Sequence, residues 1–492
     1  MTSGCPAVPS GLLFARSLSD MPRLLISAAH KSSGKTTVSI GLCAALTNRG
    51  LAVQPYKKGP DFIDPMWLSA ATGRDCRNLD FYLMGRDEIV DTYQRNAADA
   101  DVSLIEGNKG LYDGLDLDGS NSNAALAKLL HAPVVLVIDA RGMTRGIAPL
   151  ILGYQAFDRD IRIAGVILNN LGGARHEGKL RAVIEHYTDV PVLGAVHHDA
   201  RLQITERHLG LMPSNETGEA LEHIQMIGSI VGNQVDLDRL IQIANSAPTL
   251  EPVEVKTPVI STQGSNMTLR IGLARDQAFG FYYADDLDAM RQAGAEIIPF
   301  DTLNDRELPA DLDGMFIGGG FPELFMAQLE NNVSMRNSIH NAIEDGLPVY
   351  AECGGLMYLA RSLSWRNETR QMAGIIPGDV VMHGKPVGRG YVKVRCNGKN
   401  PWPDEQTGRE LQAHEFHYSS LENVPTDLTY AFDVVRGYGV DGKHDGIVYK
   451  NMLACYTHFR SLQGYNWAER FMSFVRDVRK NRTLDSKRNC NN

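Results

Sequence analysis

The stretch that decides the fold is "LLISAAHKSSGKTTVSIGLCAAL", residues 24–46, where an apolar run passes through a polar loop into a second apolar stretch. The first run predicts a buried strand and the last stretch a helix. Gly34, Lys35 and Thr36 match the end of a phosphate-binding loop, although Ala29 stands where its first glycine is expected. Backbone N–H groups there bind phosphate, Lys35 neutralises charge, and the Thr36 hydroxyl can bind Mg²⁺. We expect nucleotide-binding residues at Ser33, Gly34, Lys35, Thr36 and Thr37.

Short apolar runs alternate with longer amphipathic stretches along most of the chain, which predicts α/β domains with mostly parallel sheets. The alternation stops at a segment rich in proline, serine and threonine and resumes at Leu269 with "LRIGLAR". We therefore expect two tandem α/β domains joined by a linker. The predicted boundaries are a disordered lead-in at 1–21, a first domain at 22–245, a linker at 246–268, a second domain at 269–475 and a polar tail at 476–492.

The composition limits the classes of function. The 492 residues are 43% hydrophobic and carry a net charge of -9, which argues against a nucleic-acid partner. No apolar run approaches the roughly 20 residues that a membrane helix needs. The seven cysteines are scattered without paired metal spacing, which suits a reducing cytoplasm better than a disulfide framework.

Two acidic segments follow in the first half. "YKKGPDFIDPMW", residues 56–67, places Asp61 and Asp64 beside two lysines, and "SLIEGNKGLYDG", residues 103–114, ends a predicted strand with Glu106 and reaches Asp113 after a glycine turn. Ligands bind at the carboxyl ends of parallel strands. Any one of these acids fits an ordinary charged turn, but together with Thr36 they are candidates for binding Mg²⁺ or activating a substrate.

The second half contains a candidate nucleophile. "YAECGGLMYL", residues 350–359, has the small-x-Cys-x-Gly form of a nucleophile elbow at Cys353. A buried free cysteine is usually inert, so this motif needs partners. "FIGGGFPEL", residues 316–324, offers backbone N–H groups for an oxyanion pocket, and "ACYTHFRS", residues 454–461, offers His458 as a base. The combination predicts that Cys353 is catalytic.

These motifs, together with "KKGPDFIDP", "EGNKGLYDG", "GGGFPELF" and "HEFHYS", make the chain resemble the cobyrinic acid a,c-diamide synthase family over nearly its whole length. The resemblance implies a P-loop NTPase domain of the dethiobiotin-synthetase type followed by a class I glutamine amidotransferase domain. It also implies that Cys353, activated by His458, releases ammonia from glutamine. The implied oxyanion and glutamine-binding residues are Gly318, Gly319, Gly320 and Gly354.

The resemblance further implies that ATP with Mg²⁺ phosphorylates a carboxylate of a modified tetrapyrrole, and that ammonia then displaces the phosphate. In the family the a and c acetate side chains are amidated. Many amidotransferases carry a glutamate two residues after the histidine, but this chain has Arg460 there. A Cys–His pair is therefore the implied catalytic unit, as in the resembling family.

Other readings stay open at this point. His197, His198 and His383 depart from the expected pattern, which allows a different macrocycle such as sirohaem or (nickel) sirohydrochlorin, besides the interpretation that they are solvated loop residues. The same chemistry also serves the later cobyric acid step. Two further alternatives are a CTP-synthase-like ligase and a P-loop regulatory ATPase with a binding-only amidotransferase domain. The sequence leaves the oligomeric state open, a homodimer included.

Overall fold

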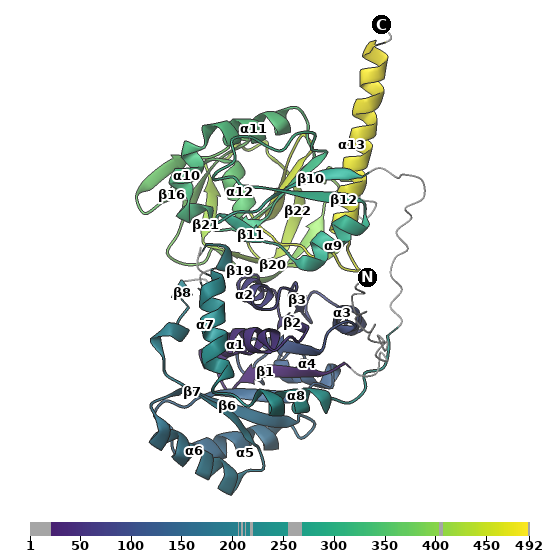
Figure 1. Ribbon diagram of the computed structural model, residues 1–492. Helices are drawn as coiled ribbons and strands as arrows, with labels where there is room; N and C mark the ends of the chain where they lie inside the picture. The colour runs from purple at the N-terminus through teal and green to yellow at the C-terminus, as the bar shows by residue number, and fades with distance from the viewer. Residues whose placement is uncertain are drawn as a thin grey trace, which may run out of the picture.

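The chain folds into two α/β domains, with the N-terminal domain below the C-terminal domain in Figure 1. The structure is a computed structural model that describes residues 21–204, 206–207, 210–211, 213–216, 220–253, 268–402 and 407–490. Residues 1–20 of the predicted lead-in and residues 254–267 of the predicted linker lie outside the described residues.

A seven-stranded sheet forms the centre of the N-terminal domain, and all its strand pairs are parallel. In order across the sheet, the strands are β3 (Arg77–Leu79), β2 (Val53–Lys58), β4 (Val102–Glu106), β1 (Arg23–Ala28), β5 (Val134–Asp139), β6 (Ile163–Leu171) and β7 (Val192–His197). The phosphate-binding loop follows the central strand β1, and Glu106 ends its neighbour β4. The predicted functional residues therefore meet at one edge of the sheet.

Helices cover both faces of this sheet. One face packs against α1 (Lys35–Asn48), α2 (Ile63–Thr72), α7 (Ala220–Gly232) and α8 (Leu237–Asn245), and the other against α3 (Arg86–Ala97), α4 (Asn123–Leu129), α5 (Ile147–Phe157) and α6 (Ala174–Tyr187). In β1, Leu24 and Ile26 join the first core and Leu25 joins the second. Successive side chains of a strand point to opposite faces, so a strand buried on both sides is continuously apolar.

A nine-stranded sheet forms the centre of the C-terminal domain. Its parallel part is β12 (Ala295–Phe300), β10 (Leu269–Ala274), β13 (Gly314–Ile317), β15 (Val349–Glu352) and β24 (Met452–Cys455), and its antiparallel part adds β23 (His444–Tyr449), β22 (Thr429–Arg436), β19 (Gly388–Cys396) and β20 (Glu410–His417). Short connections join β22 to β23 and β23 to β24, and such connections allow only antiparallel pairing. The prediction of α/β domains with mostly parallel sheets is confirmed.

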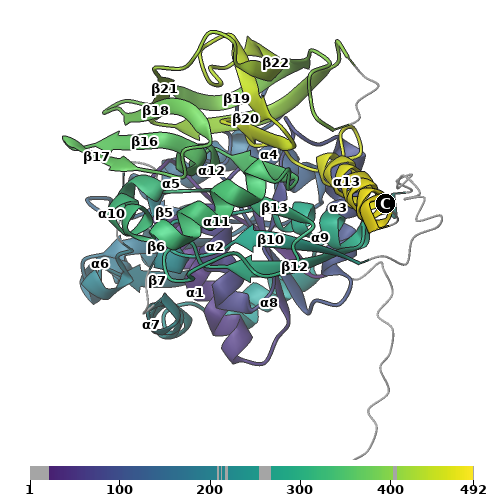
Figure 2. The ribbon, with the colours of Figure 1, turned by 90° about the horizontal axis from the view of Figure 1, so that it is seen from above.

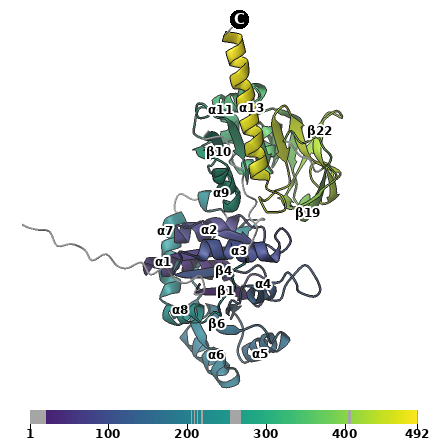
Figure 3. The same cartoon turned by 90° about the vertical axis from the view of Figure 1, so that its right-hand side faces the viewer.

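The other elements of the C-terminal domain surround this sheet (Figures 2 and 3). One core includes α10 (Met326–Asn331), α11 (Val333–Glu344) and α12 (Gly354–Leu359), and the other includes α9 (Ala284–Gln292) and α13 (Trp467–Cys490). The smaller sheets of this domain are β17 (Glu368–Gln371), β16 (Ala360–Trp365), β18 (Ile376–Met382) and β21 (Ser419–Glu422), then β11 (Phe279–Phe281) with β14 (Gly319–Gly320). The two-stranded sheet of β8 (Glu206–Arg207) and β9 (Gly210–Leu211) belongs to the N-terminal domain. In the described part of the chain, no helix has the length and apolar character needed to cross a membrane.

The segment boundaries differ from prediction at three places. Met21 and Leu250 are buried in a core of the N-terminal domain, so that domain includes residues expected in the lead-in and the linker. The predicted polar tail continues the last helix, since α13 extends to Cys490. Arg479 on this extension donates hydrogen bonds to Asp313 at 2.7 Å and to the carbonyl of Thr268 at 3.0 Å. Arg479 thus attaches the start of this extension to the domain, whereas residues 480–482 and Leu484 are exposed.

Candidate active site

Cys353 lies at a sharp turn between β15 and α12. Its backbone angles are φ 45° and ψ -99°, and positive φ is uncommon for a residue with a side chain. Such strain collects at functional sites. The next two residues must be glycines: a Cβ on Gly355 would overlap the carbonyl of Ile317, and a Cβ on Gly354 would lie 2.9 Å from the nearest backbone nitrogen. This geometry agrees with the predicted nucleophile elbow.

His458 lies beside Cys353 and is oriented by Glu352, the residue before the cysteine. Its Nδ1 donates a hydrogen bond to Glu352 at 3.0 Å, while the carboxylate also accepts from the Tyr350 hydroxyl at 2.6 Å and the Phe459 amide at 3.1 Å. Burial alone would lower the pKa of His458, but hydrogen bonds to Cys353 and Glu352 outweigh it and raise that pKa to about 10. A protonated His458 stabilises negative charge on the sulfur.

Glu352 is the residue that sequence reasoning missed, because the expected position for a third member was two residues after His458. Arg460 occupies that position and contacts Asn78 and Asp285 instead of His458. Glu352, at the end of the strand that precedes the nucleophile, orients the imidazole in its place. The sequence does contain a signal, because Glu352 interrupts the apolar run "LPVYAEC". In the structure its side chain is buried. A buried carboxylate at the end of a core strand requires hydrogen-bonding partners. The site is thus arranged as a Cys–His–Glu triad.

Glu352→Gln is expected to lower kcat for glutamine hydrolysis by about 100-fold. The neutral amide removes the charge that holds His458 protonated, so the pKa of His458 falls. The alkaline limb of the pH–rate profile should therefore move to lower pH. A steady-state assay of glutamate release across the pH range checks both effects. An unchanged profile would show that Glu352 only fills space.

The predicted oxyanion glycines separate into two groups. The Gly318 amide donates to the Tyr282 hydroxyl at 3.0 Å, so it is already occupied and differs from the expectation. Gly319 lies against His458, where a Cβ would approach the imidazole to 2.7 Å. Gly320 lines the same cavity as Cys353 and lies next to Gly354. Of the four predicted glycines, Gly320 thus lines the cavity of the thiol, and Gly354 lies beside it.

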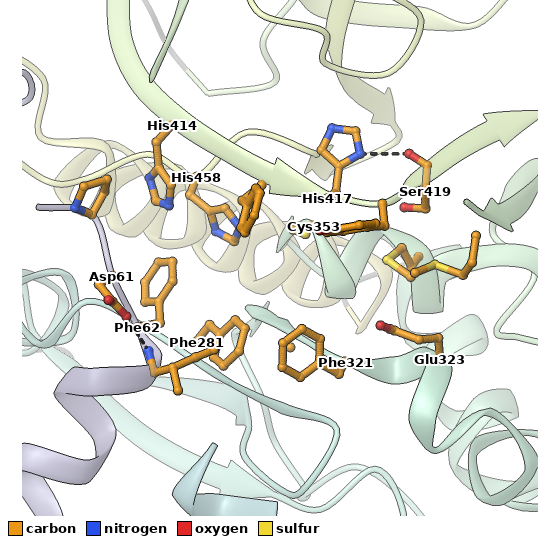
Figure 4. A pocket seen from close by; sticks show the side chains of 17 residues that line it. Asp61, Phe62, Phe281, Phe321, Glu323, Cys353, His414, His417, Ser419 and His458 are labelled. Carbon is orange, nitrogen blue, oxygen red and sulfur yellow. Dashed lines mark hydrogen bonds between the residues drawn. The ribbon is translucent and has the colours of Figure 1, made fainter. Parts of the chain in front are cut away.

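A cavity of about 200 Å³ surrounds the thiol and includes residues of the other domain (Figure 4). In Figure 4, Phe62 lies in a row with Phe281 and Phe321, opposite His414, His458 and Cys353. The Phe62 ring centroid is 5.1 Å from His458 and 5.5 Å from Phe281. The loop that follows β2 in the N-terminal domain thus forms one wall of the glutamine site.

His414 stacks on His458 with ring centroids 5.0 Å apart. Burial, and then the charge of His458, lowers the pKa of His414 well below its usual range. The two backbones also exchange hydrogen bonds of 2.8 and 3.2 Å. Only one imidazole of this pair is therefore charged, and it is the one that contacts the thiol.

The phosphate-binding loop is preformed. Gly34 caps α1 with φ 79°, and the Asn169 amide fills the space that a Cβ there would need. Asn169 also donates to the Ser33 carbonyl at 2.9 Å. Lys35 and Thr36 both donate to Glu106 at 2.6 Å. The loop's lysine and hydroxyl are thus held by the carboxylate at the end of β4.

Three of the four predicted acids meet around Lys57. Its ammonium contacts Asp64, Glu106 at 3.2 Å and Asp61 at 3.8 Å. Burial opposes ionisation of Glu106, but the charges of Lys35 and Lys57 outweigh it and lower the pKa of Glu106 to about 2. Burial, together with Asp64, raises the pKa of Asp61 to about 6. Lys57, one of the two lysines that precede Asp61 in the sequence, is therefore central to this cluster.

The cluster can accept a divalent cation. Glu106 Oε2 is buried and has no hydrogen-bond partner among the residues that the structure describes, and the Thr36 hydroxyl lies 3.3 Å from Asp64. No group of three or more His, Cys, Asp and Glu side chains within the described residues forms a metal cage by itself. Mg²⁺ commonly binds one or two carboxylates together with substrate phosphates, and this donor set fits that pattern.

The fourth acid, Asp113, lies apart from the cluster. It accepts a hydrogen bond from the Gly110 amide at 2.9 Å, and Gly110 packs against the carbonyl of Ala29 at the start of the phosphate-binding loop. Asp113 lines a second cavity between the domains, with Lys58 and Lys109. Asp113 therefore lies at the cavity between the domains, whereas Glu106 lies in the cluster around Lys57.

The three unusual histidines have separate locations. His198 lines a cavity of about 600 Å³ with Gly34 and Asn169, beside the phosphate-binding loop. His197 instead lies 3.0 Å from Glu177. His383 contacts the Ser420 hydroxyl at 2.7 Å and lines none of the cavities described here. These positions give no support to a changed macrocycle.

Arg460 joins the domains. It is buried, and donates to the carbonyl of Asn78 at 2.7 Å and to Asp285 at 2.5 Å. Asp285 also pairs with Arg77 of the N-terminal domain at 3.1 Å. Arg460 thus stands two residues after His458, where a glutamate was expected, and contacts the N-terminal domain.

Comparison with known proteins supports this two-site arrangement. The CobQ/CobB/MinD/ParA nucleotide binding domain matches residues 25–211, and the CobB/CobQ-like glutamine amidotransferase domain matches residues 270–465. The cobyrinate a,c-diamide synthase of Magnetococcus marinus is 46% identical over 93% of this chain and 98% of its own length. The chain belongs to the cobyrinate a,c-diamide synthase family.

Other family members match over similar spans. The cobyrinate a,c-diamide synthase of Methanosarcina acetivorans is 43% identical over 90% of this chain and 93% of its own length. That of Listeria monocytogenes is 41% identical over 90% of this chain and 97% of its own length. Members from these bacterial and archaeal sources thus align with both domains, as predicted from the sequence motifs.

Proposed function

We propose that this protein amidates the a and c acetate carboxylates of cobyrinic acid, using ATP and glutamine. The observation that carries the proposal is the adjacency of two sites on one chain. The cavity at Cys353 includes Asp61, and Asp61 contacts Lys57 in the cluster next to the phosphate-binding loop. The choice of cobyrinic acid as the substrate rests on membership in the cobyrinate a,c-diamide synthase family.

The first half-reaction takes place at Cys353. The thiolate attacks the side-chain amide carbon of glutamine, and the resulting oxyanion is placed near the amides of Gly320 and Gly354. His458 gives its proton to the departing nitrogen, so ammonia leaves and a thioester remains. Water, deprotonated by His458, then attacks the thioester carbon and releases glutamate and the thiol. Glu352 holds the imidazole in place throughout.

The second half-reaction takes place at the phosphate-binding loop. A substrate carboxylate oxygen attacks the terminal phosphorus of ATP, ADP leaves, and an acyl phosphate forms. Lys35 moves from Glu106 to the phosphate oxygens and neutralises their charge. Mg²⁺, bound by Thr36, Glu106 and Asp64, would supply further charge neutralisation. Ammonia then attacks the acyl carbon, and phosphate leaves to give the amide.

Ammonia passes between the sites along the loop that carries Asp61 and Phe62. Phe62 separates the thiol cavity from the carboxylate cluster, and its ring contacts His458, His414 and Phe281. The neighbouring Asp61 belongs to both surroundings. This loop belongs to the N-terminal domain and also lines the thiol cavity of the C-terminal domain. A ligand bound at one site can therefore affect the other site through this loop.

Phe62→Ala is expected to uncouple the two half-reactions. Removing the ring opens the wall between the thiol cavity and the carboxylate cluster, so ammonia escapes to solvent. The ratio of amide formed to glutamine consumed therefore falls by about tenfold. The ratio is measured by quantifying glutamate and amidated product together. The control is Phe157→Ala on α5, because that ring is 76% exposed. A ratio unchanged in Phe62→Ala would contradict this route.

Two alternatives are less well supported. Three histidines suggested a sirohaem or nickel sirohydrochlorin substrate. In the structure, His197 contacts Glu177, His383 contacts Ser420, and His198 lines the cavity beside the phosphate-binding loop. A binding-only amidotransferase domain does not need the arranged triad at Cys353. The test is mass spectrometry of product formed from cobyrinic acid and from sirohaem in parallel, with a loss of about one dalton per amide. Amidation of sirohaem alone would overturn the proposed function.

A further inference from the structure

A second cavity of about 520 Å³ lies between the two domains, within the size range of small-molecule sites. It shares Pro60, His414 and Phe416 with the cavity at Cys353. It also includes Asp113, which lies next to the start of the phosphate-binding loop. A molecule in this cavity is therefore close to both the nucleotide and the source of ammonia.

Four cationic side chains line this cavity, two from each domain: Lys58, Lys109, Arg389 and Arg436. Arg389 and Arg436 are exposed, and neither pairs with a carboxylate within the described ranges. Each guanidinium lies over an aromatic ring instead, Arg389 at 5.6 Å from Phe416 and Arg436 at 5.9 Å from Tyr82. Both are thus held in place with donors available to an anion.

The acids of the same cavity are already hydrogen-bonded. Asp80 accepts from the Tyr391 hydroxyl at 2.8 Å, Asp113 accepts from a backbone amide at 2.9 Å, and Glu415 accepts from two backbone amides at 2.8 and 2.9 Å. None of these acids pairs with one of the four cations within the described ranges. The cavity therefore presents positive charge to a ligand.

An aromatic surface adjoins these cations. Tyr82 of the N-terminal domain stacks on Tyr391 of the C-terminal domain, with centroids 4.3 Å apart and planes at 25°. Leu115 lines the same cavity and is 57% exposed, which is unusual for a large apolar side chain without a ligand. Apolar and aromatic side chains suit the face of a flat macrocycle, and guanidinium groups suit carboxylates at its periphery.

We propose that this cavity binds the polycarboxylate macrocycle, and that Arg389 and Arg436 of the amidotransferase domain pair with carboxylates at its edge. The inference rests on the proposed function and adds the location of the substrate. It assigns substrate recognition to both domains, since the two arginines come from one and Tyr82 with Lys58 from the other. A carboxylate not held by a cation can then extend past Asp113 toward the phosphate-binding loop.

The test is direct binding of cobyrinic acid to the full-length protein by isothermal titration, without ATP or glutamine. The double variant R389Q/R436Q should bind at least about tenfold more weakly than wild type, because two charge-assisted contacts are lost. Wild-type binding should weaken with added salt more steeply than binding by the variant. The matched control is Arg395→Gln, on the same strand β19 but outside the cavity and paired with Glu410 at 3.0 Å.

The outcomes separate the site from the function. Cobyrinic acid bound equally tightly by wild type and R389Q/R436Q would overturn the site and leave the proposed function standing. No binding by wild type would overturn both. A neutral methyl ester of the same macrocycle should show no difference between wild type and variant. Thermal unfolding of the double variant, compared with wild type, verifies that the amidotransferase domain is folded, which is expected because both arginines are exposed.

Discussion

Cys353→Ala is expected to lower glutamine-dependent amidation by at least about a thousandfold while ammonia-dependent amidation continues. Only the thioester step needs the thiol, and the acyl phosphate forms at a separate site on the other domain. Free ammonia in solution can therefore replace glutamine. The measurement is product formation with glutamine or with an ammonium salt at the same pH.

The control for this variant is Cys396→Ala, which removes a buried thiol of β19 in the same domain. It should keep the use of glutamine, because no catalytic role is assigned to it. Retained glutamine use by Cys353→Ala would show that the elbow is not the nucleophile. Loss of both activities would mean that the substitution disturbs the domain interface.

Lys35→Ala is expected to lower amidation by at least about 100-fold with either nitrogen source. In the proposed reaction its ammonium neutralises the charge that develops on the transferred phosphoryl group, and in the structure it contacts Glu106 at 2.6 Å. Removing it leaves that charge without its main partner and leaves Glu106 less compensated. The measurement is ADP release in the presence of cobyrinic acid, with ammonia supplied so that the thiol site is bypassed.

Lys128→Ala is the matched control for that variant, because the Lys128 side chain is 41% exposed and pairs with Asp158 at the surface. Surface pairs contribute little to stability, so this variant should behave like wild type. Normal ADP release by Lys35→Ala would place the phosphate-binding site elsewhere. The two variants together distinguish loss of a catalytic charge from loss of any lysine.

The parts predicted well from sequence are those with a local signal. The phosphate-binding loop and the cysteine elbow are short motifs in which the backbone conformation depends on nearby glycines, and both appear in the structure as predicted. The alternation of apolar runs was enough to predict two α/β domains. Such signals depend on residues close together in the chain, so they can be read without knowing the tertiary structure.

The parts that were missed depend on contacts between distant segments. Glu352 contacts His458 across 106 positions, and Phe62 reaches the thiol cavity from the other domain. Arg460 contacts Asn78, 382 positions away. Nothing in the neighbouring sequence specifies these partners. Gly318 was predicted as an oxyanion donor because it belongs to a glycine run, but Tyr282 occupies its amide.

The most direct test of the central claim uses cobyrinic acid with heavy oxygen in its carboxylates. The enzyme is supplied with ATP, Mg²⁺ and glutamine, and the released phosphate is analysed by mass spectrometry. An acyl phosphate intermediate transfers a carboxylate oxygen to phosphorus, so we expect one heavy oxygen in the phosphate for each amide formed. Amide formed with unlabelled phosphate would contradict the proposed reaction.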